Sequence, residues 1–411
     1  MIRQFLPIAL SRRVLRVLCL LAFAAVVGRA PAADIHITAE FKPDINDPNK
    51  REFVNTTPWS GVCLNHMALC ISNNWWSIDT KVRGTKQGNR GSIHGPGSFH
   101  IGMPPPRRVE VVSEDGHTFI VDLKMIGAAL RLRDVAQDGP NSHPASKGAA
   151  QGCAISLSNY RTNNYSVMRM FNRNDGGEGY QVCTLHWIDS NDYWVEEFDF
   201  TYALTTPSPL QMRSGVYTGS TTYHVGGTGE GADFDLGDDV VLDDNSVTVH
   251  FSLTVQHAFQ LDLPPGNDRA VLAPKGGWTQ WSDHGIVPKA LEREVPFTLS
   301  SSGQFSVSMQ CQYPLPDGRC AIRNLTEAAP DAPLDITLTL PGFRDALSGA
   351  DVVGKMLTTD MRPTVFTADA FVIRRPSQLR FAVTGEAVEE MLEHPGSHYR
   401  GDVTVIFDAD P

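Results

Sequence analysis

Short runs that alternate apolar and polar residues recur along most of this 411-residue chain, and they limit its fold more than any other feature. Each run is rich in Val, Ile, Thr, Phe or Tyr and has Gly, Pro, Asn or Asp near its ends, as strands joined by turns do. Helical patterning is sparse and limited to a short turn over Ala387–Glu393. The pattern predicts an all-β protein built of antiparallel β-sandwiches. The expected strands are Asp34–Phe41, Val109–Val112, Phe119–Leu123, Ala154–Leu157, Trp194–Tyr202, Ser246–Val255, Phe305–Met309, Leu334–Leu340, Phe371–Ile373 and Gln378–Val383.

The first 33 residues have the layout of a secretory signal. Four arginines come before or at the edge of an apolar run, Val17–Val27, and small residues follow at Ala30–Ala33. The run is shorter than the roughly 20 residues that a membrane-spanning helix needs. The pair Arg12-Arg13 leaves open whether export follows the general or the twin-arginine route.

Removal of this segment would change the net charge of the chain. Removing residues 1–33 takes away five arginines and no acidic residue, so the formal charge goes from −11 to −11 − 5 = −16. Such an acidic protein is a poor match for a nucleic-acid partner that is held through its phosphates. No nucleic-acid partner is therefore expected.

Six cysteines remain once Cys19 leaves with the signal. An even number of cysteines in an exported chain predicts disulfides, and proximity along the sequence favours Cys63–Cys70, Cys153–Cys183 and Cys311–Cys320. There is no C-x-x-C pair and no histidine at zinc-finger spacing. We expect neither a metal site nor another cofactor.

A Pro-Pro-Gly-Asn-Asp run at 264–268 is the best candidate for a linker. It divides the exported chain into an N-terminal unit over 34–263 and a C-terminal unit over 269–411. A weak repeat, Tyr-x-Gly-x-x-Thr, occurs at Tyr217–Thr222 and again at Tyr399–Thr404, and it helps to place this boundary.

The chain closes on an alternating strand. Val403, Val405 and Phe407 fall on one face of this strand, and Thr404 and Ile406 fall on the other. A chain that ends in this way offers an unpaired backbone edge with a row of apolar side chains, and such an edge invites a pairing partner. The ordinary alternative is a last strand that is already paired within its own sheet.

The C-terminal unit resembles the pilin-type domain of fimbrial subunits that are assembled by the chaperone–usher pathway. The resemblance rests on the runs Val295–Ser300, Phe305–Cys311, Leu334–Gly342 and Tyr399–Pro411, together with the Cys311 and Cys320 pair. The alternate, class 5-like group is the most similar, and the whole chain resembles its minor tip adhesins, in which a receptor-binding sandwich precedes the pilin sandwich. The likeness is good over 295–411 and thin over 34–263.

This resemblance implies two immunoglobulin-like β-sandwich domains, the second of which needs a donor strand. It implies a periplasmic chaperone, an outer-membrane usher and a neighbouring fimbrial subunit as partners, with strand addition as the mode of contact. The edge that accepts the strand would include Tyr399, Val403, Val405 and Phe407. The protein would pass through the periplasm to the fimbrial tip on the bacterial surface and attach to a glycan or protein receptor on a host or in a biofilm.

One run departs from the tip-adhesin pattern. Asp34–Phe41 alternates cleanly directly after the expected cleavage site. In shaft subunits an N-terminal strand of this kind is donated to a neighbour, whereas a tip subunit has no neighbour ahead of it. We expect the run to be the first strand of the N-terminal unit. If it is donated instead, the chain is an internal adaptor.

The N-terminal unit holds five of the seven tryptophans, at positions 59, 75, 76, 187 and 194. Asn74, Trp75 and Trp76 follow the Cys63–Cys70 loop and suit sugar recognition, because amides bond hydroxyl groups and indoles stack on sugar rings. Adjacent strand residues point to opposite faces, so at most one of the two indoles is expected in the core. The alternative is that they are core anchors beside a disulfide.

A polar loop near Cys183 offers a second candidate for ligand binding. It contains Asn174 and Asp175, and a solvated turn is the alternative. Lys81, Arg83, Lys86 and Arg90 form a basic island, for which a solvated face is the preferred interpretation.

Catalytic motifs are missing from the sequence, which has no G-x-S-x-G, no H-E-x-x-H and no phosphate-binding glycine loop. We therefore expect a non-enzymatic protein. Two alternatives to a tip adhesin stay open. One is a fimbrial adaptor or assembly initiator that binds no host receptor. The other is a secreted polysaccharide hydrolase that uses Glu197 and Asp199 as acid and base.

Overall fold

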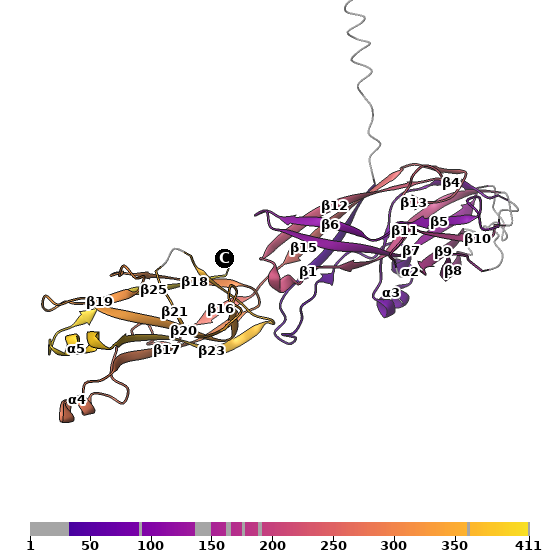
Figure 1. Cartoon of the computed structure of the whole chain (residues 1–411). Coiled ribbons are helices and arrows are strands. Elements are labelled where there is room, and N and C mark those ends of the chain that lie inside the picture. The colour runs from indigo at the N-terminus through magenta and orange to yellow at the C-terminus, as the bar shows by residue number, and fades with distance from the viewer. Residues whose placement is uncertain are drawn as a thin grey trace, which may run out of the picture.

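The computed structural model describes residues 33–89, 93–135, 149–161, 166–174, 177–187, 191–359 and 362–409. The expected signal lies outside these ranges except for Ala33. None of the helices in the described ranges is long and apolar enough to cross a membrane. Two β-rich units follow one another along the chain, each with its own sheet and hydrophobic core (Figure 1). The prediction of an all-β protein with two sandwich units is confirmed.

The N-terminal unit consists of strands and two short helices, α2 (Val62–Asn65) and α3 (Met67–Asn73), with a 3-10 turn at Pro209–Gln211. Its strands are β1 (Ala33–Phe41), β2 (Val54–Asn55), β3 (Trp76–Asp79), β4 (Gly84–Gln87), β5 (Phe99–Met103), β6 (Arg107–Ser113), β7 (Thr118–Asp134), β8 (Cys153–Arg161), β9 (Ser166–Arg173), β10 (Gln181–Leu185), β11 (Asp192–Thr205), β12 (Gly215–Gly226), β13 (Phe234–Asp235), β14 (Val240–Leu242) and β15 (Ser246–Val255).

A large sheet of this unit runs in the order β14-β4-β11-β7-β6-β12-β15-β1-β2, while β5 and β10 form a separate pair. Alternate residues of the long strands face the main core, as period-two patterning requires. The helices α2 and α3 cover part of the opposite face of the sheet, where Val62 and the Cys63–Cys70 disulfide pack on Ala129 of β7 and Met168 of β9. We call this pair of helices the α2–α3 cap.

The first strand is held inside its own unit. β1 runs parallel to β15 from Ala33 opposite Val247 to Phe41 opposite Val255, and β2 pairs with its other edge. Ile35 and Ile37 are buried in the core. The run after the expected cleavage site is therefore a strand of the N-terminal unit, which is the interpretation that the sequence favoured.

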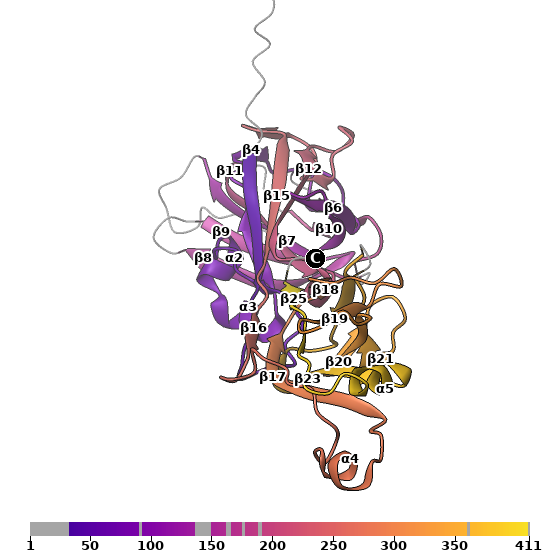
Figure 2. The ribbon, with the colours of Figure 1, turned by 90° about the vertical axis from the view of Figure 1, so that its left-hand side faces the viewer.

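The C-terminal unit contains a sheet in the order β16-β17-β23-β20-β22-β18-β25, with β19, β21 and β24 paired alongside. The two helices are α4, at the end of a loop that projects from the sheet (Figure 2), and α5. Their bounds are Thr279–His284 and Glu386–Leu392. The strands are β16 (Phe259–Asp262), β17 (Ala290–Ser301), β18 (Phe305–Cys311), β19 (Cys320–Asn324), β20 (Ala332–Asp345), β21 (Asp351–Met356), β22 (Thr364–Thr367), β23 (Val372–Thr384), β24 (Tyr399–Arg400) and β25 (Val403–Asp408).

The chain passes from the first sheet to the second between Val255 and Phe259. β16 pairs with β17, and Phe259 and Leu261 pack on the second core. The run at 264–268, which was the expected linker, follows this strand. Its two prolines cannot donate to a strand ladder, so they end the pairing of β16 without ending the unit. We propose 256–258 as the junction.

His257 ties the two units together at this junction. Its Nε2 lies 2.8 Å from the carbonyl oxygen of Met212 in the first unit, and its Nδ1 lies 3.2 Å from Oγ of Ser302 in the second. A Cβ at Gly303 would come within 2.6 Å of the imidazole, so glycine permits this close approach. One side chain therefore bonds to both units.

The substitution His257→Ala is expected to loosen the junction, because both of these hydrogen bonds are lost and a void opens beside Gly303. Small-angle scattering or spin-label distances between the two units should show a broader distribution, while each core keeps its own melting transition. The exposed His224 supplies the control variant His224→Ala. An unchanged distance distribution in His257→Ala would show that the imidazole does not fix the junction.

Candidate functional site

The last strand, β25, forms one end of the C-terminal sheet. It pairs with β18 from Asp408 opposite Ser306 to Val403 opposite Cys311. No other described strand pairs with it. The outer backbone edge of β25 is thus open within the part of the chain that the structure describes.

Three apolar side chains of β25 are only half-buried. Val403, Val405 and Phe407 pack against the core of the C-terminal unit, whereas Thr404 and Ile406 on the other face are exposed. The ring of Phe407 lies 5.6 Å from that of Phe297 on β17. One further strand beside β25 would cover these side chains and pair with the open edge.

Tyr399 lies apart from this edge. It belongs to the short strand β24, where it pairs with Asn324 of β19, and it is half-buried against the same core. The Cys311–Cys320 disulfide, with a Cα–Cα distance of 5.6 Å, links the end of β18 to the start of β19. Tyr399 therefore supports the strands around the edge and does not form part of it.

Trp75 and Trp76 are both half-buried and pack on opposite sides of the sheet. Trp76 packs on the main core and stacks with Trp59, with ring centres 6.3 Å apart. Trp75 packs on the cluster beneath the α2–α3 cap. The sequence pattern predicted opposite faces for these indoles, but it did not predict that the cap covers the second face. Asn74, which ends α3 in a left-handed conformation, is exposed.

The second expected ligand loop lies at the end of β9. Asn174 is exposed, and its backbone N–H donates to Oε1 of Gln181 at 2.9 Å. Asp175 lies outside the described residues. The Cys153–Cys183 disulfide, with a Cα–Cα distance of 5.3 Å, links β8 to β10 nearby. The described part of this loop has the geometry of a turn.

The basic island is not one solvated face. Lys81 is exposed, but Arg83 is held by two hydrogen bonds to Asp79, of 2.9 and 2.7 Å. Lys86 is buried, and its Nζ donates to the backbone oxygen of Asp238 at 2.9 Å. Burial lowers the pKa of Lys86 to about 8. Arg90 lies outside the described residues.

The two carboxylates of the hydrolase alternative lie beneath the α2–α3 cap. Glu197 is paired with Arg131, with an Oε2–Nε distance of 2.8 Å. Asp199 is fully buried, and a Cβ on the overlying Gly61 would lie 2.8 Å from its side chain. A polysaccharide therefore cannot reach Asp199, and the carboxylate of Glu197 is already paired with a guanidinium.

Burial raises the pKa of Asp199 well above its ordinary value, and the neighbouring charge of Glu197 acts in the same direction. The backbone N–H of Val62 opposes the shift. Neither carboxylate oxygen of Asp199 has a hydrogen-bond partner of ordinary geometry. The folded protein therefore favours the protonated form of Asp199 more strongly than water favours it for an ordinary aspartate.

Trp194 is the most exposed of the five tryptophans in the N-terminal unit, with 42% of its surface open to solvent. Its neighbours on β11, Tyr193 and Val195, are buried in the core. Alternation therefore places the indole on the outer face of the sheet. Trp194 is not among the ligand residues expected from the sequence, although the alternation of Tyr193, Trp194 and Val195 is a signal that points to it.

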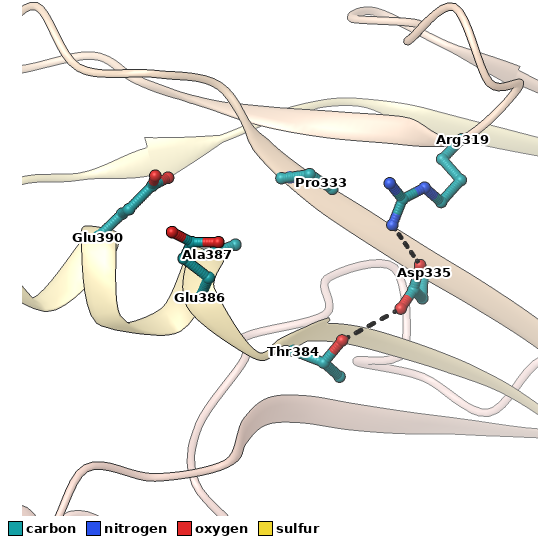
Figure 3. Close-up of a pocket in the computed structure, with 7 residues that line it drawn as sticks. All are labelled: Arg319, Pro333, Asp335, Thr384, Glu386, Ala387 and Glu390. Carbon is teal, nitrogen blue, oxygen red and sulfur yellow. Dashed lines mark hydrogen bonds and ion pairs between the residues drawn. The ribbon is translucent and has the colours of Figure 1, made fainter.

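The described surface of the C-terminal unit has a polar hollow of about 260 Å³ beside α5 (Figure 3). Arg319 is paired with Asp335 at 3.3 Å, and the hydroxyl of Thr384 donates to the same carboxylate. Glu386 and Glu390 of α5 stand on the other side of the hollow (Figure 3). The charges of Arg319 and Asp335 already satisfy each other, so the hollow offers little to a charged ligand.

Neither a protein-family model nor a curated protein matches the sequence. Among solved structures, CfaE, the adhesive subunit of CFA/I fimbria of enterotoxigenic Escherichia coli, aligns over 92% of this chain and 92% of its own, with 9% identity and a TM-score of 0.24. A chaperone–tip adhesin complex of CFA/I fimbriae aligns over 92% of this chain and 96% of its own, with 10% identity and a TM-score of 0.25.

The CsuC–CsuE chaperone–tip adhesion subunit pre-assembly complex, from the archaic chaperone–usher Csu pili of Acinetobacter baumannii, aligns over 92% of this chain and 98% of its own. The identity is 11% and the TM-score is 0.21.

Proposed function

We propose that this protein is a non-enzymatic fimbrial tip adhesin of the alternate chaperone–usher class. The observation that carries the proposal is the open edge of β25, with Val403, Val405 and Phe407 half-buried on its inner face. An alternating strand that is paired on one edge and open on the other is what an incomplete sandwich presents to a donor strand. The signal-like segment and the disulfides agree with export to an oxidising compartment.

In this proposal a periplasmic chaperone pairs with the outer edge of β25 first, and an outer-membrane usher then exchanges it for the donor strand of the neighbouring subunit. The pairing of β1 with both β15 and β2 supports a tip position, since that strand is not free to be donated. The N-terminal unit is then the receptor-binding part on the bacterial surface. Asn74, Trp75, Trp76, Asn174 and Asp175 stay its sequence-based candidates for ligand contact.

The proposal is tested by two substitutions on one strand, in the chain expressed with a periplasmic chaperone of the alternate class. Val405→Arg places a charge on the half-buried inner face of β25, and Thr404→Arg places the same charge on its exposed face. Chaperone capture is expected to be lost in Val405→Arg and kept in Thr404→Arg, because a buried unpaired charge is costly. Size-exclusion chromatography of the complex measures the capture.

Equal capture of the two variants would contradict strand addition at this edge. A wild-type chain that is a stable monomer without chaperone or donor peptide would contradict the incomplete sandwich. The melting transition of the N-terminal unit reports in each variant whether the rest of the chain has folded.

A further inference from the structure

We propose that the outer face of the N-terminal sheet around Trp194 is a binding platform for an uncharged sugar ring. The inference deepens the proposed function and rests on it, since it names the ligand class of the receptor-binding unit. We call this surface the Trp194 platform, and its members are Thr85, Arg133, Trp194, Glu196 and Val241.

The platform is built by strand register. Trp194 of β11 lies opposite Thr85 of β4 on one side and opposite Arg133 of β7 on the other. Val241 of β14 lies opposite Thr85 in the next pair. Residues that are directly opposite in register share one face of a sheet, so these four side chains form a row across four strands. Trp194 and Val241 are the exposed apolar members, at 42% and 70%.

Two charged side chains, Arg133 and Glu196, lie beside the indole of Trp194. A register shift in β11 between Val195 and Glu197 leaves Glu196 without a partner in the ladder, and its Oε1 reaches Nε of Arg133 at 2.5 Å. Both side chains keep part of their surface in solvent, 37% for Arg133 and 26% for Glu196. The pair therefore presents fixed donors and acceptors beside an aromatic face.

The platform lies beyond the edge of the α2–α3 cap. Arg131 and Asp199, which are further along β7 and β11 on the same face, are buried beneath the cap. Trp194 is the next large side chain along β11 on this face after Glu197, and it is exposed and is not a member of the cluster under the cap. An apolar side chain of this size is left in water at a cost, whereas its neighbours Tyr193 and Val195 are buried.

This arrangement matches the chemistry of a sugar ring. A pyranose has a face of C–H groups, which an indole face can cover, and a rim of hydroxyl groups, which carboxylate and guanidinium groups can bond in pairs. The guanidinium of Arg133 is already neutralised by Glu196. Without residues 1–33 the chain carries a formal charge of −11 − 5 = −16, so its long-range field disfavours anionic ligands. The platform thus favours neutral sugars over acidic ones.

The test uses the full mature chain with nitrogen-15-labelled indoles and three probes, namely lactose, cellobiose and 3′-sialyllactose. Lactose or cellobiose is expected to shift the indole N–H signal of Trp194, which is assigned by its loss in Trp194→Phe. Trp194→Ala is expected to weaken binding of that sugar by at least about tenfold in Kd. Trp278→Ala is the matched control, because Trp278 of the C-terminal unit is also 42% exposed and lies away from the platform.

Three results would each overturn the inference. Neither neutral disaccharide shifts the indole signal, Trp194→Ala binds the sugar as tightly as the wild-type chain does, or 3′-sialyllactose binds more tightly than lactose. The chaperone-capture experiment distinguishes failure of the sugar-binding inference from failure of the proposed fimbrial function. A chain whose capture depends on Val405 but which binds no sugar overturns the platform alone. A chain that binds sugar through Trp194 without capture overturns the fimbrial role alone.

Discussion

Fusing an alternating apolar strand to the end of the chain through a short flexible linker is expected to raise the Tm of the C-terminal unit by the order of 10 °C. The added strand would pair with the open edge of β25 and cover Val403, Val405 and Phe407. A fully buried apolar side chain contributes about 1.5–3 kcal/mol, and 1 kcal/mol corresponds to about 2–4 °C in a unit of this size. Differential scanning calorimetry of the mature chain measures the change.

The matched control is the same extension with serine at every inward-facing position. It keeps the backbone donors and acceptors but has no side chains to bury, so we expect a rise much smaller than that of the apolar strand. If both extensions leave the Tm of the C-terminal unit unchanged, β25 is an ordinary last strand and the sandwich is already complete.

Asp199→Asn is expected to stabilise the N-terminal unit at neutral pH. Burial holds the pKa of Asp199 well above its ordinary value of 3.8, and each unit of such a shift corresponds to about 1.4 kcal/mol. Below pH 3.8 the carboxyl is protonated in both the folded and the unfolded chain and carries no penalty. As the pH rises toward the folded pKa, only the unfolded chain releases its proton, so the stability falls. Asparagine has nearly the same shape as aspartic acid, but its side chain does not ionise, so it carries no such pH-dependent penalty.

Urea unfolding between pH 4 and pH 8 measures this effect. The free energy of unfolding of the wild-type chain should fall more steeply with pH than that of Asp199→Asn. A lower stability of the variant at pH 7, or an unchanged slope, would contradict the assignment of Asp199 as a buried acid whose pKa is raised by burial.

Asp79, which lies opposite Asp199 in the strand register, provides the comparison. Burial by itself would raise its pKa, but hydrogen bonds from Arg83 and Lys81 hold the pKa of Asp79 below its ordinary value. This contribution is present above the unfolded pKa and is lost as the pH falls through the folded one. Asp79→Asn is therefore expected to destabilise the protein at pH 7 by about 1–3 kcal/mol, the opposite sign to Asp199→Asn.

Local pattern was sufficient wherever a strand is made of one uninterrupted run. The expected strand Ser246–Val255 is β15 with the same bounds, and α5 lies within one residue of the expected turn. The prediction was wrong at β23, where the two expected strands Phe371–Ile373 and Gln378–Val383 are one strand that continues through Pro376. Proline is disfavoured within strands, but pairing with β17, in which Pro376 lies opposite Thr298, keeps this one extended, and the pairing with β20 starts only at Gln378.

Pairing between distant segments decided what local pattern could not. The prolines at 264 and 265 are a good local signal for a linker, yet β16 before them pairs with β17 of the second unit. Lys86 is a charged residue in a polar run, and it is nevertheless buried, with its Nζ bonded to Asp238. Neither outcome follows from the residues next to these positions.

The sequence alone determined the period-two alternation and the inward row Val403, Val405 and Phe407, because strand faces depend only on the residues within a strand. It also determined the even number of cysteines after residue 33. The tertiary structure decided that β25 has one open edge and that Trp194, rather than Trp75 or Trp76, faces solvent. Exposure and edge position depend on which strand or helix lies alongside. That neighbour comes from elsewhere in the chain, so no local pattern encodes it.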